Sequence, residues 1–201
     1  IEQELRRLAG SSKTGKVTIV AHSNGGLVAK ALLNKLGGET AKSLVDNIIF
    51  VGVPQSGAPR AVGSLLYGTG EGLPLESFDL LLSKAVAREF SERSPMAYHL
   101  LPSAQYFADV NDPSHSVGEF TGTNGFAEER TAYGSILDTA SELHDFLLAL
   151  DGGREKPSTN DTSEANVLNE ALIDYALNTH TALDAWLPPS GITLYQLAGW
   201  G

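Results

Sequence analysis

The chain of 201 residues is long enough for a domain with a buried core, and its composition, 42% hydrophobic and 19% charged, is typical of a globular protein. The formal net charge of −10 disfavours binding to nucleic acid and attraction to anionic membranes. The absence of cysteine excludes disulfides, a thiol nucleophile and a thiolate metal site, and no apolar run approaches the ~20 residues that span a bilayer.

The first part of the chain alternates between helical and strand patterns. Residues 1–9 have the spacing of an amphipathic helix, Val17–Ala21 predicts a strand, residues 25–36 a helix and Val45–Val53 a second strand. The second strand is a continuous apolar run, as expected of a parallel strand covered on both faces. This α-β-α-β order predicts an α/β fold with a doubly wound parallel sheet. The sequence shows no signal peptide and begins inside the first predicted helix, which suggests a trimmed or partial chain.

The pattern changes after the Gly/Pro-rich loop 54–59. From about residue 60 to 187 no strand is predicted, and the helical patterns cover roughly 59–67, 78–90, 138–150 and 163–187. Thr162 or Ser163 is the expected N-cap of the last of these helices. The segment 151–163 between the last two helices is polar and predicts the least ordered part of the chain.

A third predicted strand, 191–198, returns the chain to the sheet. The layout is therefore a hydrolase-like core over residues 1–58, a mostly helical insertion over 59–187 and a returning core strand within 188–201. An insertion of this length is far longer than an ordinary connection. It is interpreted as a cap or lid beside the carboxyl ends of the strands, or alternatively as a structural subdomain with no gating role.

Ser23 lies where the first strand runs without a spacer into the following helix. Ala21 precedes it by two positions and Gly25 follows it by two, which matches the nucleophile elbow G-x-S-x-G with Ala for the first Gly. Small residues at these positions let the strand and the helix approach closely around a strained turn. The motif predicts Ser23 as a nucleophile and the backbone N–H of Asn24 as a donor to a developing oxyanion.

Three stretches resemble one family. The run 21–26 (AHSNGG) with 52–59 (GVPQSGAP) resembles the elbow and next strand-end loop of α/β-hydrolases of the lecithin:cholesterol acyltransferase-like group. The run 94–103 (SPMAYHLLPS) is similar to that group's P-S-A-Y-x-L-L-P-S segment in the cap, and 195–201 (YQLAGWG) resembles its next strand and turn. The departures are Ala21 for Gly and Gln55 where a His is common.

This resemblance implies acyl-ester chemistry on lipid-like substrates. Ser23 would attack the carbonyl, form an acyl-enzyme and pass the acyl group to water or an alcohol. In the group, the triad acid follows the strand that here is 191–198 and the His follows a later strand, so both would lie beyond Gly201. His22 and Gln55 are expected to line the site. No metal or other cofactor is implied; the expected partner is a lipid or other ester, with contact to a lipid surface through the cap.

Other interpretations remain open. A histidine of the insertion, His99, His115, His144 or His180, could in principle act as the base, against the usual order of the fold. The oxygen-rich loop with Asp109, Asn111, Asp112 and Glu119 is interpreted as a polar surface loop rather than a calcium site. At the level of function, the alternatives are a non-catalytic lipid- or partner-binding module with a degenerate hydrolase fold, and a peptidase or small-ester esterase.

Overall fold

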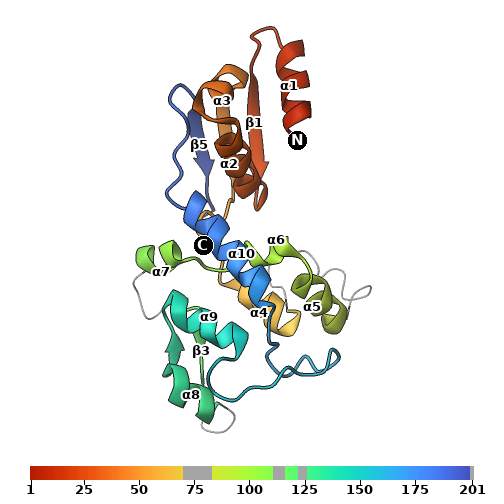
Figure 1. Cartoon of the computed structure of the whole chain (residues 1–201), viewed down its shortest axis with the longest axis vertical. Coiled ribbons are helices and arrows are strands. Elements are labelled where there is room, and N and C mark those ends of the chain that lie inside the picture. The colour runs from red at the N-terminus through yellow and green to blue at the C-terminus, as the bar shows by residue number, and fades with distance from the viewer. Residues whose placement is uncertain (70–82, 111–115, 122–125, 200–201) are drawn as a thin grey trace. The chain divides into compact units, whose positions relative to one another are not determined.

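The fold has two compact units, seen in a computed structural model that describes residues 1–69, 83–110, 116–121 and 126–199 (Figure 1). Unit 1 comprises Ile1–Gln55 and Thr181–Gly201, and unit 2 comprises Ser56–His180. The chain therefore leaves unit 1 after the second predicted strand and returns to it before the last one.

Unit 1 contains a small parallel sheet with helices packed along it. Its elements are α1 (Glu2–Ser11), β1 (Val17–His22), α2 (Gly25–Leu36), α3 (Gly38–Leu44), β2 (Val45–Val51) and β5 (Thr193–Leu197). All three predicted strands are confirmed, each within two residues. The structure adds α3 between the predicted helix 25–36 and the predicted strand 45–53, where no helix is predicted. Gly37 separates α2 from α3 with a φ of 76°, a conformation that glycine adopts at little cost.

The strands lie in the order β1-β2-β5, and the sheet is parallel, as the α-β-α-β pattern predicts. Ile48 and Phe50 of β2 are fully buried and join the core formed with the helices. On the other face, Val20 of β1 and Tyr195 of β5 lie in register on either side of Ile49 and are 67% and 54% exposed. Ile49 itself is half-buried, so the described residues cover β2 fully on one face and in part on the other. One face of this sheet carries apolar side chains that described residues do not cover.

Unit 2 is mostly helical. It contains α4 (Arg60–Tyr67), α5 (Lys84–Glu92), α6 (Pro95–Tyr98), α7 (Ala104–Asp109), β3 (Gly118–Glu119), α8 (Ala127–Tyr133), β4 (Ile136–Leu137), α9 (Ala140–Leu148) and α10 (Glu170–Leu183), whose last residues belong to unit 1. Its core is separate from that of unit 1 and includes Leu65, Tyr98, Leu137, Leu147 and Ile173. The predicted helices 59–67 and 138–150 are confirmed, and 78–90 is confirmed from Lys84 onward, since residues 70–82 lie outside the described part.

Three features of unit 2 differ from the sequence expectation. Strands β3 and β4 form a two-residue antiparallel pair where no strand is predicted. Helix α10 begins at Glu170, and the side chain of Asn169, rather than Thr162 or Ser163, accepts the N–H of Leu172. The segment 151–163 has no helix or strand, but carbonyls of its later residues accept hydrogen bonds from the buried Arg88 of α5.

Candidate functional site

The junction between β1 and α2 has the backbone that the sequence predicts for a sharp strand-to-helix turn. β1 ends at His22, Ser23 has a φ of 52°, and α2 begins at Gly25. A residue with a Cβ pays a steric cost in this left-handed region, which is why such residues rarely adopt it. Among the described residues other than glycine, only Ser23 and Ala149 have a positive φ. Ser23 is therefore held in a strained conformation at the carboxyl end of a parallel strand.

Hydrogen bonds connect this turn to the neighbouring strand and to the helix. The N–H of Ser23 donates to the carbonyl oxygen of Val51 at the end of β2, at 3.1 Å, and the N–H of Gly26 donates to the carbonyl of Ser23, at 3.0 Å. Asn24 is 7% exposed, and its carbonyl accepts the N–H of Leu27. The turn thus lies at the amino end of a 12-residue helix, where the helix dipole favours negative charge.

Close approach of α2 to another segment takes place at Gly26 rather than at Gly25, and that segment is the loop after β2. A Cβ built on Gly26 would lie 2.3 Å from Cγ1 and 2.4 Å from Cγ2 of Val53, distances that no packed side chain tolerates. The same construction on Gly25 meets nothing within 4 Å. The reason inferred from the motif for Gly25 is therefore wrong at this position. Gly26 instead makes room for Val53, two residues beyond the end of β2.

The carboxyl edge of the sheet also places Gln55 beside Gln196. The Nε2 of Gln55 donates to Oε1 of Gln196 in β5 at 3.3 Å, while Oε1 of Gln55 is buried without a hydrogen-bond partner among the described residues. His22 is exposed at the same edge, in register with Val51. The four residues predicted for the site, His22, Ser23, Asn24 and Gln55, therefore all lie at this edge of the sheet. Gln196 lies at the same edge. The sequence indicates Gln196 only as part of a strand, and no spacing rule singles it out.

Other titratable groups gather in unit 2. Nε2 of His180 lies 2.9 Å from the carbonyl oxygen of His99, and the His99 ring lies 5.2 Å from that of Tyr175 between centroids. Burial, and secondarily the charge of His180, lower the pKa of His99 below its ordinary value. Nδ1 of His144 lies 2.9 Å from Oδ1 of Asp145, its neighbour on α9. Within unit 1 the sequence contains a single histidine, His22.

The described residues provide no group of three or more His, Asp or Glu side chains suited to a metal ion. Asn111 and Asp112 of the oxygen-rich loop, and His115, lie outside the described residues. No helix in the described ranges is both long and apolar enough to cross a membrane.

Comparison with known proteins shows similarity to a plant phospholipase and to one chain of a solved complex. The phospholipase A(1) LCAT3 of Arabidopsis thaliana is 27% identical over 192 residues, which make up 92% of this chain and 40% of that protein. A chain in the crystal structure of the Tle4–Tli4 complex aligns with a TM-score of 0.44 and 21% identity, over 91% of this chain and 37% of that one. The chain therefore spans about two fifths of the length of these relatives.

The family comparison covers most of the chain. The model of the lecithin:cholesterol acyltransferase family matches residues 4–181, a range that includes the β1–α2 turn, β2 and all of unit 2. This match confirms the resemblance seen in the sequence motifs. The chain belongs to the lecithin:cholesterol acyltransferase family.

Proposed function

We propose that this chain carries the nucleophile of a serine hydrolase or acyltransferase that acts on lipid-like carboxylic esters. The observation that carries the proposal is the left-handed backbone of Ser23, φ 52°, in a strand-to-helix turn of a chain of this family. A strained serine at such a turn projects its hydroxyl above the sheet edge in enzymes of the α/β-hydrolase fold. The similarity to a protein named phospholipase A(1) supports the lipid class of the ester.

In the proposed reaction, Ser23 Oγ attacks the ester carbonyl and forms an acyl-enzyme, which water or an alcohol then cleaves. The backbone N–H of Asn24 donates to the oxyanion of the tetrahedral intermediate, helped by the positive end of the α2 dipole. His22 and Gln55 line the site, and Gln196 holds the Gln55 amide. The general base and its acid are proposed to lie outside these 201 residues, because the only histidine of unit 1 immediately precedes the nucleophile.

Unit 2 is proposed to be the cap of this enzyme. The family match extends through it, and it follows the carboxyl end of β2, the sheet edge at which ligands bind in open α/β sheets. A cap of this kind excludes water and shapes the acyl pocket. The cap is also the proposed region of contact with a lipid surface.

The test is covalent labelling of Ser23 with a fluorophosphonate, followed as a gain of intact mass. Four proteins are compared: the 201-residue chain and a longer natural protein that contains it, each with Ser23 intact and with Ser23→Ala. Ser43→Ala, which removes an exposed serine of α3, is the matched control. A serine without its general base is a weak nucleophile, so we expect strong labelling only in the longer protein with Ser23 intact.

The outcomes separate the functional classes. Labelling of the short chain that disappears with Ser23→Ala would mean that a base lies within the 201 residues, which overturns the proposed location of the triad. A longer protein that is silent despite an intact Ser23 would favour the non-catalytic lipid- or partner-binding module. Turnover of short-chain esters in preference to long-chain ones would favour the small-ester esterase.

A further inference from the structure

The side-chain amide of Gln55 is hydrogen-bonded at one end only. Its Nε2 donates to Oε1 of Gln196 at 3.3 Å, whereas its Oε1 is buried and has no hydrogen-bond partner among the described residues. Buried amide oxygens almost always accept a hydrogen bond, because an unpaired one keeps the full cost of leaving water. A buried acceptor that these residues leave unpaired therefore indicates a donor supplied by a bound molecule.

Gln196 determines which end of the Gln55 amide is left open. A side-chain carbonyl oxygen accepts hydrogen bonds and cannot donate them, so Oε1 of Gln196 holds the NH₂ end of Gln55 and leaves the oxygen end without a partner. Gln196 is exposed and Gln55 is half-buried, so the pair lies at the border between the protein interior and solvent. Gln196 thus orients Gln55 without being buried itself.

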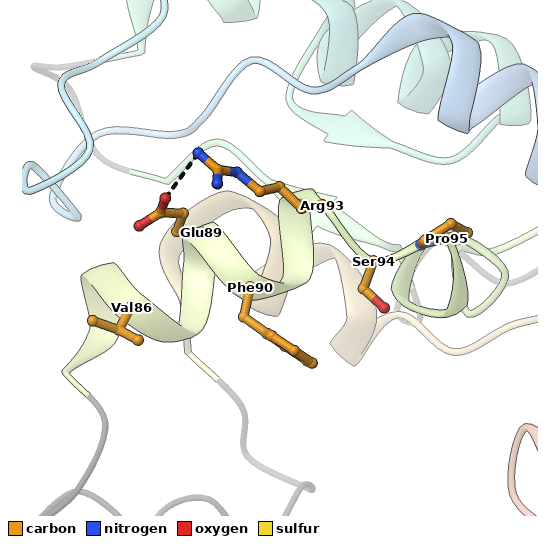
Figure 2. Close-up of a pocket in the computed structure, with 6 residues that line it drawn as sticks. All are labelled: Val86, Glu89, Phe90, Arg93, Ser94 and Pro95. Atoms are coloured by element: carbon orange, nitrogen blue, oxygen red, sulfur yellow. Dashed lines mark ion pairs between the residues drawn. The ribbon is translucent and has the colours of Figure 1, made fainter.

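A pocket along α5 in unit 2, with a volume of about 470 Å³, differs in this respect (Figure 2). Its two charged side chains bind each other, since Nη2 of Arg93 lies 2.8 Å from Oε1 of Glu89, and both are exposed. None of the side chains that line it has a buried polar atom without a partner among the described residues. An unmet hydrogen-bond acceptor therefore distinguishes Gln55 from the polar groups of this pocket.

Backbone hydrogen bonds across the sheet edge relate the amide pair to the nucleophile turn. The N–H of Ser23 donates to the carbonyl of Val51 at 3.1 Å, and the N–H of Gly52 donates to the carbonyl of Leu197 at 2.9 Å. The order of strands is β1-β2-β5, and neighbouring strands are ~4.8 Å apart, which puts the Gln55 amide roughly 5–10 Å from Ser23. A few covalent bonds of ~1.5 Å beyond an ester carbonyl cover this distance.

The segments around the amide favour a neutral donor. Residues 22–26, 51–57 and 193–199, which form this edge, contain no Asp, Glu, Lys or Arg. Burial of an ammonium without a carboxylate, or of a phosphate without a cation, is costly. A hydroxyl carries no charge and donates one hydrogen bond, as the open oxygen of Gln55 requires. The edge is therefore suited to a hydroxyl rather than to an amine or a phosphate.

We propose that Gln55 accepts a hydrogen bond from a free hydroxyl on the alcohol portion of the ester, and that Gln196 is the positioning residue for this contact. The inference rests on the proposed function for the place of the ester at Ser23. The selected substrates are esters of polyhydric alcohols, such as glycols and glycerol, in which a second hydroxyl lies a few bonds from the ester oxygen. A site built to bind a hydroxyl rejects an analogue that lacks it, because the acceptor is then left unpaired.

The test measures the binding of two ethers that differ only in this hydroxyl. Ethylene glycol monohexyl ether carries it, and hexyl propyl ether has a methyl group in its place. Calorimetry gives the dissociation constant of each, and the hydroxyl preference is the ratio of the two. The protein is the longer natural protein with Ser23→Ala, so binding is read without catalysis. Failure of fluorophosphonate labelling would reject the proposed function, whereas only these ratios decide the role of Gln55.

Gln55→Met keeps the length of the side chain and removes its oxygen. We expect the hydroxyl preference to fall about tenfold, since pairing of a buried acceptor is worth about that much. Gln3→Met, which removes an exposed amide of α1, is the matched control and is expected to keep the preference. A substitution that only loosened the fold would weaken the binding of both ethers and leave their ratio unchanged.

Two substitutions of Gln196 separate positioning from structural support. The carboxylate introduced by Gln196→Glu still accepts from Nε2 of Gln55, so the hydroxyl preference is expected to persist. The ammonium introduced by Gln196→Lys only donates, so it binds the oxygen of Gln55 and leaves the NH₂ end open. We expect this variant to lose the preference about tenfold, as Gln55→Met does.

Three results would overturn the proposal. The first is an equal hydroxyl preference in Gln55→Met and in the protein with Gln55 intact, or no measurable binding of the hydroxyl ether to the latter. The second is a preference that survives Gln196→Lys, which would reject the positioning role of Gln196. The third is tighter binding of the hexyl ether of ethanolamine than of the hydroxyl ether, which would assign the subsite to a cation.

Discussion

Gly26 is the residue at which the β1–α2 turn is least tolerant of change. Because a Cβ at this position would lie 2.3–2.9 Å from side-chain atoms of Val53, Gly26→Ala forces either α2 or the loop after β2 to move. We expect a loss of about 1–3 kcal/mol in the free energy of unfolding, the usual cost of overpacking. Chemical denaturation measures it.

Gly25→Ala is the matched control, one residue earlier in the same helix. A Cβ added to Gly25 would meet nothing within 4 Å, and its φ is not positive, so alanine gains helix propensity without a clash. We expect a change between zero and about 1 kcal/mol in the stabilising direction. Equal losses for the two variants would contradict the packing argument.

The left-handed backbone of Ser23 predicts that replacing this residue with glycine stabilises the protein. A left-handed residue with a Cβ pays about 1–2 kcal/mol that glycine does not, so Ser23→Gly is expected to raise the free energy of unfolding by about 1 kcal/mol. Ser23→Ala keeps the Cβ and is expected to show no such gain. Ala149→Gly, at the left-handed C-cap of α9 with φ 53°, is the comparison for the same effect away from the site. A Ser23→Gly variant less stable than Ser23→Ala would contradict the strain.

The sequence motif identifies the predicted site residues but not those defined by three-dimensional packing. Ser23 and Asn24 follow from a spacing of five residues along the chain. Gly26 and Gln196 do not, because their partners Val53 and Gln55 are distant in sequence. A motif gives the residue types that recur along the chain. The clash of a Cβ at Gly26 with Val53 can be seen only in the folded structure, where α2 lies against the loop after β2.

At the scale of elements, α5 holds the segment that precedes α10 through one buried side chain. The guanidinium of Arg88 donates to the carbonyls of Ser158, Thr159 and Asp161 at 2.8 Å each, and more distantly to Glu164 and Leu66. The planar fork of arginine suits several acceptors at once, whereas the ammonium of lysine has three donors at a single point. Arg88 thus takes the place of the regular hydrogen bonds that this segment lacks.

Arg88→Lys is therefore expected to destabilise unit 2 by about 2–3 kcal/mol, since several hydrogen bonds from a buried charged group are lost. The readout is the free energy of unfolding, with amide exchange of residues near 158–164 as a local probe. Arg93→Lys on the same helix is exposed and is expected to change stability by less than about 0.5 kcal/mol. Similar effects of the two substitutions would contradict the proposal that Arg88 holds the segment before α10.

Long elements are predictable from this sequence and short ones are not. The strands β1, β2 and β5 and the helices α2, α4 and α9 show the period of their structure over several residues. In contrast, α3, α7 and α8 have six or seven residues each, and β3 and β4 two, so their periodicity is too short to detect. The sequence misplaces the beginning of α10 because Thr162 and Ser163 are good capping residues in a segment that Arg88 holds in another conformation.

At the scale of the whole molecule, the order of elements predicts a parallel sheet interrupted by a helical insertion, and the structure has two units with separate cores. What the order of elements does not predict is that one face of the sheet is exposed among the described residues. Val20, Tyr195 and Leu197 are apolar, and an apolar strand pattern alone does not say which side chains cover it. Whether a strand side chain is buried depends on residues far away in the sequence. The periodicity of the strand carries no information about those residues.

The acid stability of the molecule is set by groups whose pKa differs between the folded and unfolded chain. Burial, and then His180, lower the pKa of His99 below its ordinary 6.5, and its buried Nε2 has no hydrogen-bond partner among the described residues. Burial raises the pKa of Glu92, but hydrogen bonds from Lys156 and Asn166 outweigh it and lower the pKa below 4.5. Both groups lie in unit 2, so both pKa shifts change the stability of that unit.

The signs of these shifts predict two successive losses of stability on acidification. The unfolded chain protonates His99 first, so stability falls as pH decreases through about 6.5, by at most one proton, about 1.4 kcal/mol for each pH unit. The contribution of Glu92 persists above 4.5 and is lost as pH falls through its lowered pKa. Urea unfolding between pH 8 and pH 3 (approximately the range that brackets both groups) measures both steps. His99→Gln should flatten the first step, and Glu92→Gln should flatten the second. A first step that is unchanged in His99→Gln would show that another group titrates there.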